Sequence, residues 1–281
     1  MSPPGRPKGG ELRSAKHGGF LMSNARVVGA EALDTLAPDD PAAIRSRRDL
    51  WRIHGAMGTQ AIVTTALRDL LGKRPSGAPL QVLELGAGDG QLMLGVARAL
   101  ANHSTKHSAN HSAIARIELT LLDRQRLVAP ATIAGYAAVG WTAVQLGADV
   151  ADWAGAANDS QADAPHWDLI VANLFMHHFE GGRLASLLAA IAQRCDRFFA
   201  CEPRRAWLAL AGSHLVGAIG ANAVTRQDAV LSVHAGFRGA ELSALWPGHA
   251  ADWAVEEYSA GLFSHCFRAQ RRAASGAAQS R

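Results

Sequence analysis

The stretch 80-LQVLELGAGDGQLMLGVARALA-101 decides the fold. A short apolar run, which predicts a strand over 80–85, passes directly into a turn that contains Gly86, Gly88 and Gly90. An amphipathic segment follows, which predicts a helix. A glycine-rich turn between a strand and a helix lets the backbone approach a ligand closely, and such turns usually hold a nucleotide-like molecule. The rest of the chain has to show which molecule this turn suits.

Strand-like and helix-like segments alternate along the chain from this point. The expected strands cover residues 80–85, 116–123, 141–146, 167–174, 197–203, 252–259 and 262–270, and helices are expected over 90–101, 124–139 and 180–195. This order predicts an α/β fold with a doubly wound, Rossmann-like and mostly parallel sheet of about seven strands, the last one antiparallel. Ligands of such sheets bind at the carboxyl ends of the strands, which is where the glycine-rich turn lies.

Two helical regions are expected around this alternation. Apolar residues recur at steps of three and four over 39–71, which predicts two helices within an N-terminal cover over 27–78. The main domain extends over 79–270. It includes residues 203–248, which are too long for a single crossover helix, so we expect a helical insertion there. The cover and the insertion together are expected to enclose a substrate.

Apolar side chains are frequent in this insertion: Trp207, Leu208, Leu210, Leu215, Val216, Ile219, Phe237 and Trp246. If they line the substrate site, the substrate is apolar or aromatic; equally, they are the core residues of ordinary helices. The uncharged run over 206–224 is long enough to reach across a bilayer, but Ser213 and His214 interrupt it. A buried or substrate-covering helix is therefore favoured, and no stable membrane insertion is expected.

The net charge of +4 is concentrated at the two ends of the chain. Residues 1–26 carry +4 and residues 268–281 another +4, which leaves −4 on residues 27–267. The segments 1–26 and 271–281 have the composition of disordered tails. A nucleic-acid-binding protein normally carries its basic residues on the folded surface that meets phosphate, so no nucleic-acid partner is expected.

Three cysteines, Cys195, Cys201 and Cys266, form neither an even set nor a metal-binding spacing. A disulfide framework is therefore not expected, and a reducing, cytoplasmic compartment is favoured. The N-terminal residues include basic side chains but lack the apolar core of a secretory signal. The oligomeric state is left open by the sequence, a homodimer included.

Acidic residues around the glycine-rich turn distinguish between ligands. The dinucleotide fingerprint G-x-G-x-x-G needs a third glycine where this chain has Gln91. Glu84 precedes the first glycine by two residues and Asp89 lies within the turn, and both would repel a pyrophosphate. A ligand with a positive charge and an ammonium group would be attracted instead. S-adenosylmethionine has both and carries no phosphate.

With these motifs the sequence resembles the class I S-adenosylmethionine-dependent methyltransferases over residues 80–202. VLELGAGDG resembles the glycine-rich motif I, LTLLD the second strand, LGADVADW the acidic motif after the third strand, and DLIVANLFMHHF motif IV, in the order of the family. Motif IV lacks the two prolines typical of amino-group methyltransferases that act on DNA or protein glutamine, which favours small-molecule O- or C-methylation. The distance from Gly90 to Asp123 exceeds the usual spacing of about twenty residues, and a polar loop insertion over 102–112 accounts for the excess.

The resemblance implies a role in cofactor binding for a set of residues in these motifs: Glu84, Gly86, Ala87, Gly88, Gly90, Asp123, Arg124, Asp149, Val150, Asn173 and Leu174. In the family, the acid in the place of Asp123 binds the ribose hydroxyls, and the acid in the place of Asp149 faces the adenine amino group. Each aspartate also opens a non-strand segment and could be a helix N-cap instead. His103, His107 and His111 would share one face of a helix and could bind a metal there, but the low-complexity composition favours a solvated loop, and no metal site is expected.

Two adjacent histidines in motif IV, His177 and His178, are the candidate catalytic residues. Histidine titrates near neutral pH and suits removal of a hydroxyl proton during methyl transfer. Neighbouring side chains cannot point the same way, so one histidine is expected to face the substrate and the other the protein interior. The alternative is that the pair only shapes the pocket, because methyl transfer requires chiefly an aligned acceptor in a dry site.

The sequence therefore predicts an enzyme that transfers a methyl group from S-adenosylmethionine to a small, apolar or aromatic acceptor. Two alternatives remain open at this point. One is an oxidoreductase that uses a nicotinamide or flavin, against which Glu84 and Gln91 argue. The other is a catalytically silent protein that has kept the fold and the cofactor site, because motifs for binding do not report on turnover.

Deletion of residues 1–21 is expected to leave the melting temperature and cofactor affinity unchanged, because this segment lacks apolar periodicity. Thermal unfolding and calorimetry of the shortened and full chains would test this expectation. A clear drop in melting temperature would show that the segment packs against the folded domain.

Overall fold

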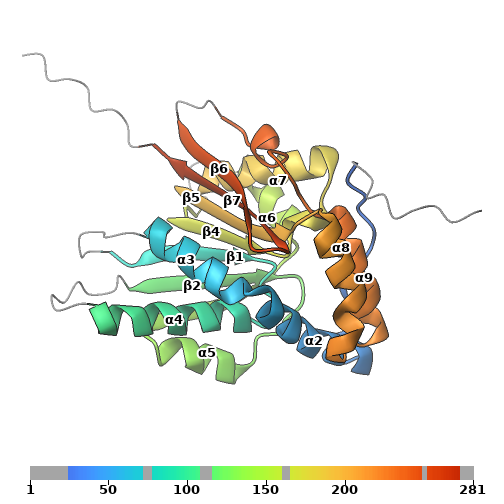
Figure 1. Ribbon diagram of the computed structural model, residues 1–281. Coiled ribbons are helices and arrows are strands. Elements are labelled where there is room, and N and C mark those ends of the chain that lie inside the picture. The colour runs from blue at the N-terminus through green and yellow to red at the C-terminus, as the bar shows by residue number, and fades with distance from the viewer. Residues whose placement is uncertain (1–24, 72–77, 108–115, 160–164, 249–251, 273–281) are drawn as a thin grey trace, which may run out of the picture.

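The computed structural model of the chain describes residues 25–71, 78–107, 116–159, 165–248 and 252–272. Within these residues a seven-stranded sheet has the order β3-β2-β1-β4-β5-β7-β6 (Figure 1). The strands are β1 Leu80–Leu85, β2 Ile117–Asp123, β3 Trp141–Gly147, β4 Leu169–Asn173, β5 Arg197–Pro203, β6 Trp253–Ala260 and β7 Ser264–Arg271. All neighbouring pairs from β3 to β5 are parallel, and β7 runs antiparallel to both β5 and β6. The predicted doubly wound sheet with an antiparallel last strand is confirmed.

Helices cover both faces of the sheet (Figure 1). They are α1 Ala32–Thr35, α2 Pro41–Met57, α3 Thr59–Leu71, α4 Gln91–His107, α5 Pro130–Ala137, α6 Val150–Asp159, α7 Gly181–Arg194, α8 Trp207–Leu215 and α9 Ala223–Ala235, with short 3-10 helices η1 Met176–His178, η2 Val216–Ile219 and η3 Ser243–Leu245. A hydrophobic core lies on each face of the sheet, and β1 contributes to both cores because side chains alternate along a strand. Val82 packs with α3 and α4, whereas Leu83 and Leu85 pack on the side of α7.

Two of the expected local structures were wrong. Helix α4 continues to His107, so residues 102–107 are helical and not part of a loop; residues 108–115 lie outside the described part of the chain. The helix expected over 124–139 is shorter, because α5 begins only at Pro130, where the missing N–H of proline is tolerated. Residues 124–129 are instead a loop at the carboxyl edge of the sheet.

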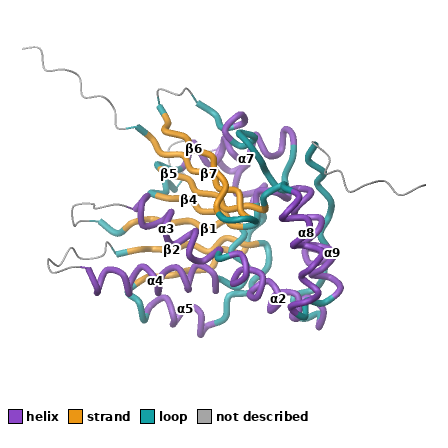
Figure 2. The backbone as a smooth tube through the Cα atoms, in the orientation of Figure 1, coloured by secondary structure: helices purple, strands orange, loops and turns teal. Residues whose placement is uncertain are grey.

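Helices α1 and α2 and the insertion after β5 lie together at the carboxyl ends of the strands, whereas α3 packs on a face of the sheet beside α4 (Figure 2). Buried polar contacts join α2 to α9: Ser46 Oγ lies 2.8 Å from Thr225 Oγ1, and the backbone N–H of Asn222 donates to Asp49 Oδ2 at 2.8 Å. The Asn222 side chain also accepts from the Thr225 N–H and thereby caps α9. The N-terminal cover and the helical insertion are therefore joined to each other by buried polar contacts.

The apolar residues of the insertion lie either in the protein core or at the surface. Leu210, Phe237 and Trp246 are buried in the protein core, whereas the side chains of Trp207 and Leu215 are 69% and 66% exposed. None of the eight apolar side chains contacts the cavity that lies at the carboxyl ends of β1, β2 and β4. The alternative that these side chains are core residues holds for Leu210, Phe237 and Trp246, and an apolar acceptor stays a prediction. Among the described residues, no helix has both the length and the apolar character that a membrane crossing requires.

Candidate active site

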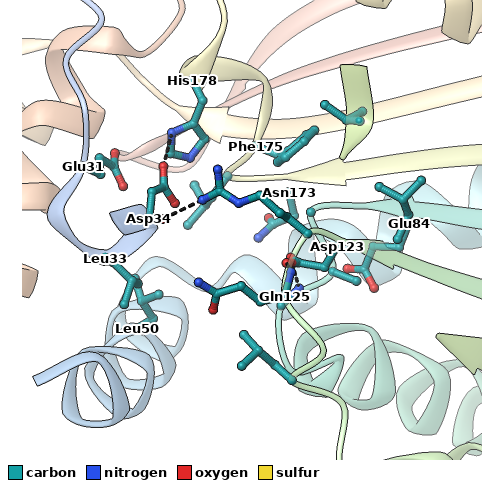
Figure 3. A pocket seen from close by; sticks show the side chains of 18 of the residues that line it. Glu31, Leu33, Asp34, Leu50, Glu84, Asp123, Gln125, Asn173, Phe175 and His178 are labelled. Atoms are coloured by element: carbon teal, nitrogen blue, oxygen red, sulfur yellow. Dashed lines mark hydrogen bonds and ion pairs between the residues drawn. The ribbon is translucent and has the colours of Figure 1, made fainter. Parts of the chain in front are cut away.

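A cavity of about 440 Å³ lies at the carboxyl ends of β1, β2 and β4 (Figure 3). Its walls come from the glycine-rich turn, from the segments that follow β2, β3 and β4, and from α1 and α2 of the cover. The volume is in the usual range of small-molecule sites. Figure 3 shows two ends: Glu84 and Asp123 lie at one, and Glu31, Asp34 and His178 lie at the other.

The glycine-rich turn needs its glycines for two different reasons. Gly86, Gly88 and Gly90 have φ angles of 68°, 55° and 71°, a region that side-chain-bearing residues rarely adopt. A Cβ on Gly86 would lie 2.2 Å from the ring of Phe175, and one on Gly90 would lie 3.2 Å from Leu121. A Cβ on Gly88 would meet no atom within 4 Å, and Gly88 lines the cavity. The middle glycine therefore leaves open space where a ligand could approach the backbone.

The two aspartates expected at the cofactor site both line the cavity, and both also bind backbone. Asp123 accepts from the N–H groups of Gly88 and Gln125, each at 2.8 Å. Its carboxylate thus ties the end of β2 to the glycine-rich turn. Asp149 accepts from the Ala151 N–H at 2.8 Å at the start of α6, so the N-cap interpretation is realised. Capping and exposure to the cavity are compatible, because a carboxylate oxygen has more than one lone pair.

Ten of the eleven residues expected at the cofactor site line the cavity; Gly90 packs beneath it. Ala87 and Val150 contribute to the wall, and Arg124 donates to the backbone oxygen of Asp34 at 2.6 Å. Leu174 has a φ of 49° and is the one non-glycine residue with positive φ in the described part of the chain. Such strain is typical of functional sites, since surrounding contacts must hold it in place. The Leu174 N–H donates to the Cys201 oxygen at 2.9 Å.

Three buried polar atoms in the cavity wall have no hydrogen-bond partner: Glu84 Oε2, Asn173 Oδ1 and His54 Nδ1. Glu84 is only 4% exposed, and burial raises its pKa to about 8, with Asp123 and Asp89 adding to the shift. Unsatisfied buried polar groups are rare and costly in native proteins. A ligand that carries polar groups at this end of the cavity would satisfy them.

His177 does not face the cavity as a free base, because both ring nitrogens are engaged. Its Nδ1 lies 2.8 Å from Glu202 Oε2, and its Nε2 lies 3.3 Å from Glu31 Oε1. Burial alone would lower the pKa of His177, but the hydrogen bonds and the charges of these two carboxylates raise it to about 9. Burial works against ionisation of Glu31 too, yet its pKa is lowered, chiefly by the hydrogen bond with His177. His177 is therefore a cation that joins two acids.

His178 has the opposite environment. Its side chain is 22% exposed and lines the cavity, and its Nδ1 lies 3.3 Å from Asp34 Oδ2 (Figure 3). Burial lowers the pKa of His178, and the neighbouring positive charge of His177 lowers it further. The imidazole is therefore neutral near pH 7 and can accept a proton. The expectation that the two adjacent histidines face different surroundings is met.

Glu31, His177 and His178 place possible metal-ligand atoms within 4.8 Å of one another. For His177 to bind a cation through Nε2, it would have to lose the proton that it shares with Glu31. In the structure the protonated ring of His177 lies between two carboxylates and supplies the positive charge that they need.

The sequence reasoning missed four residues of this site: Glu31, Asp34, His54 and Glu202. Glu202 stands at the end of β5, and the rule that ligands gather at the carboxyl ends of parallel strands could have marked it. Glu31 and Asp34 belong to a short segment without periodicity, so only the folded chain brings them to motif IV.

Comparison with known proteins supports the architecture. No protein-family model matches the sequence. No curated protein matches it either. Among solved structures, the plantazolicin methyltransferase BpumL in complex with SAH is 13% identical, with a TM-score of 0.52, and the match covers 83% of this chain and 92% of that one.

Two further structures show the same architecture. The plantazolicin methyltransferase BamL, in complex with a triazolic desmethylPZN analog and SAH, is 12% identical, with a TM-score of 0.53 over 85% of this chain and 93% of that one. An O-methyltransferase family protein from Burkholderia thailandensis is 14% identical, with a TM-score of 0.50 over 83% of this chain and 60% of that one. At these identities the likeness concerns the fold. The chain shares the fold of these solved methyltransferases, and the fold expected from its motifs is confirmed.

The charge of His177 can be tested through the pH dependence of stability. Its folded pKa is about 9, above the ordinary value of 6.5, so its proton stabilises the fold below pH 6.5, and this contribution is lost as the pH rises through 9. We expect His177→Gln to lower the free energy of unfolding at about pH 6, and the difference from the unsubstituted chain to shrink at about pH 9.5. Urea denaturation at both pH values measures this change.

His166→Gln is the matched control, because His166 also bonds to an acid, Asp196, but is exposed and does not line the cavity. A His177→Gln difference that stays constant between the two pH values would contradict the protonated state.

Proposed function

We propose that the chain transfers a methyl group from S-adenosylmethionine to a hydroxyl group of a small-molecule acceptor. The observation that carries the proposal is Glu84, a buried acid whose Oε2 has no partner and lies in the cavity wall beside the glycine-rich turn. An ammonium group suits such an acid, because its positive charge would stabilise the ionised form that burial disfavours. The open space at Gly88 and the cavity-facing Asp123 fit the nucleoside part of the same cofactor.

A dinucleotide suits this site less well. Its pyrophosphate would lie beside Asp89 and Glu84, and the N–H groups that usually hold it are already used: Gly88 donates to Asp123, and Ala87 donates to the Leu122 oxygen. A nicotinamide or flavin dinucleotide would therefore lack a binding site for its pyrophosphate, which is its most charged part. The solved methyltransferases with SAH that share the fold support the same choice of ligand.

In this proposal the acceptor binds at the other end of the cavity, where His178 Nδ1 lies 3.3 Å from Asp34 Oδ2 (Figure 3). When bound, the cofactor supplies an electrophilic methyl group whose bonding electron pair returns to sulfur on transfer. His178 acts as the general base: with its Nδ1–H directed to Asp34, Nε2 is left to take the hydroxyl proton as the acceptor oxygen forms its new bond to carbon. His177 holds the neighbouring loop through Glu202 and Glu31 and is not itself the base.

Cofactor choice is tested by calorimetry of the purified chain with S-adenosylhomocysteine (SAH) and, separately, with NADH. We expect SAH to bind and NADH not to bind. Gly88→Val should weaken SAH binding at least about tenfold, because a branched side chain would fill the space at which the backbone meets the ligand.

Gly140→Val is the matched control for backbone strain. Gly140 also has a positive φ, 81°, and open space at its Cβ position, but it lies outside the cavity. Equal SAH affinities for the Gly88→Val and Gly140→Val variants, both folded, would overturn the assignment of the turn.

The role of His178 is tested by turnover once an acceptor is found, for instance by mass spectrometry of small-molecule extracts incubated with the protein and a deuterated-methyl cofactor. His178→Ala should then lower turnover by roughly 10²–10⁴ while SAH affinity barely changes. Because its pKa is lowered, the unsubstituted chain should keep its activity down to pH values below 6.5, and the acid limb should disappear in the variant. Asp34→Asn should keep the limb but lower turnover less. Small, equal losses for His177→Ala and His178→Ala with an unchanged pH profile would show that no base is needed.

A further inference from the structure

His54 is the unpartnered cavity residue that neither the motifs nor the proposed reaction explains. It lies in the last turn of α2, in the N-terminal cover, and its Nδ1 is buried without a hydrogen-bond partner. A buried imidazole nitrogen without a partner costs free energy, so an ordinary packing role leaves this cost unexplained. Because His54 lines the cavity, a bound ligand is the available source of a partner.

His54 and Glu84 both line the cavity, as does Asp89. The charge of Asp89, in the glycine-rich turn, acts on both side chains: it raises the pKa of Glu84, and it opposes the effect of burial on His54, whose pKa burial lowers to about 4. His54 is therefore a neutral imidazole near pH 7, with one N–H to donate. The three unpartnered atoms of the wall thus combine two oxygen acceptors, on Glu84 and Asn173, with one potential donor, on His54.

This combination is complementary to an α-amino acid group. The two oxygens suit an ammonium, and an imidazole N–H suits a carboxylate. We propose that His54 Nδ1–H binds the carboxylate at the amino-acid end of the cofactor while Glu84 and Asn173 bind the ammonium. This inference rests on the proposed function, since it assigns a ligand within the same cavity.

Other donors near the carboxylate are already in use. In the glycine-rich turn, the N–H of Ala87 donates to Leu122, that of Gly88 to Asp123, and that of Gly90 to Ala87. The backbone therefore offers none of these three groups to an anion, although such turns commonly bind one.

The three arginines of the cavity wall have other contacts. Arg47 donates to the Pro38 oxygen, Arg124 donates to the Asp34 oxygen, and the guanidinium of Arg183 lies 5.8 Å from the centre of the Phe179 ring. Among the buried atoms of the cavity wall that lack a partner, the potential donor for the carboxylate is His54 Nδ1.

The test compares two ligands that differ only in the carboxylate: SAH and its decarboxylated analogue, S-adenosyl-3-thiopropylamine. Calorimetry should show that His54→Leu weakens SAH binding about 10- to 100-fold, the range expected for a lost hydrogen bond to a charged group. Affinity for the decarboxylated analogue should be the same in His54→Leu and the unsubstituted chain, because the lost bond has no partner in that ligand.

Two further variants complete the experiment. His54→Asn should keep most of the SAH affinity, since its side-chain amide N–H can take the place of Nδ1–H. His166→Leu, at an exposed histidine outside the cavity, should bind both ligands normally.

Equal weakening of both ligands by His54→Leu would overturn the inference and leave the proposed function standing, because it would show that His54 acts through packing alone. The inference also fails if His54→Asn loses as much SAH affinity as His54→Leu. Absence of SAH binding to the unsubstituted chain would instead overturn the proposed function, and this inference with it.

Discussion

The carboxylate of Glu202 is the group on which the arrangement of the cavity depends most. It is fully buried at the end of β5 and accepts from three consecutive backbone N–H groups, those of Phe175, Met176 and His177, at 3.1, 2.9 and 3.3 Å. A buried negative charge needs a compensating positive one, and His177 supplies it. The imidazolium in turn holds Glu31, which belongs to the N-terminal cover. One acid on a central strand therefore fixes the loop after β4, determines which of the two histidines stays neutral, and attaches the cover to the sheet.

The sequence predicted the structure correctly where the residues concerned lie within one strand or directly after it. The apolar runs of β1 and β5 gave their bounds directly, and the glycines after β1 lie in the turn that the pattern predicts. The bounds of α4 and α5 were wrong for local reasons. The polar composition of residues 102–107 favoured a loop, but α4 continues through them. The segment before Pro130 was predicted to be part of α5, but it is a loop that contributes residues to the cavity wall.

The contacts at the His178 end of the cavity could not be predicted from the sequence, for a different reason. Asp34 meets His178, and Glu31 meets His177, across more than 140 residues of chain. No local pattern encodes such a contact, because nothing in residues 27–38 distinguishes an acid that pairs with a histidine from an acid that faces water. The apolar side chains of the insertion misled for a related reason: composition reports that a helix has an apolar face but not what that face meets. Thus the sequence predicted the fold and the residues of the glycine-rich turn that line the cavity, but not the contacts that Glu31 and Asp34 make at its other end.

The joining of α2 to α9 has a consequence for the order in which the chain acquires its structure. Ser46 and Thr225 are separated by 179 positions, and Ser232 contacts Glu31 across 201. Contacts between such distant positions form late, because the entropy of closing a long loop must be overcome before they contribute stability. During synthesis, residues 31–57 therefore lack the partners of these polar contacts until α9 has been made. Strands β1 to β5 can pair in the order of their synthesis, but the cavity at the edge of the sheet closes only when the N-terminal cover meets α9.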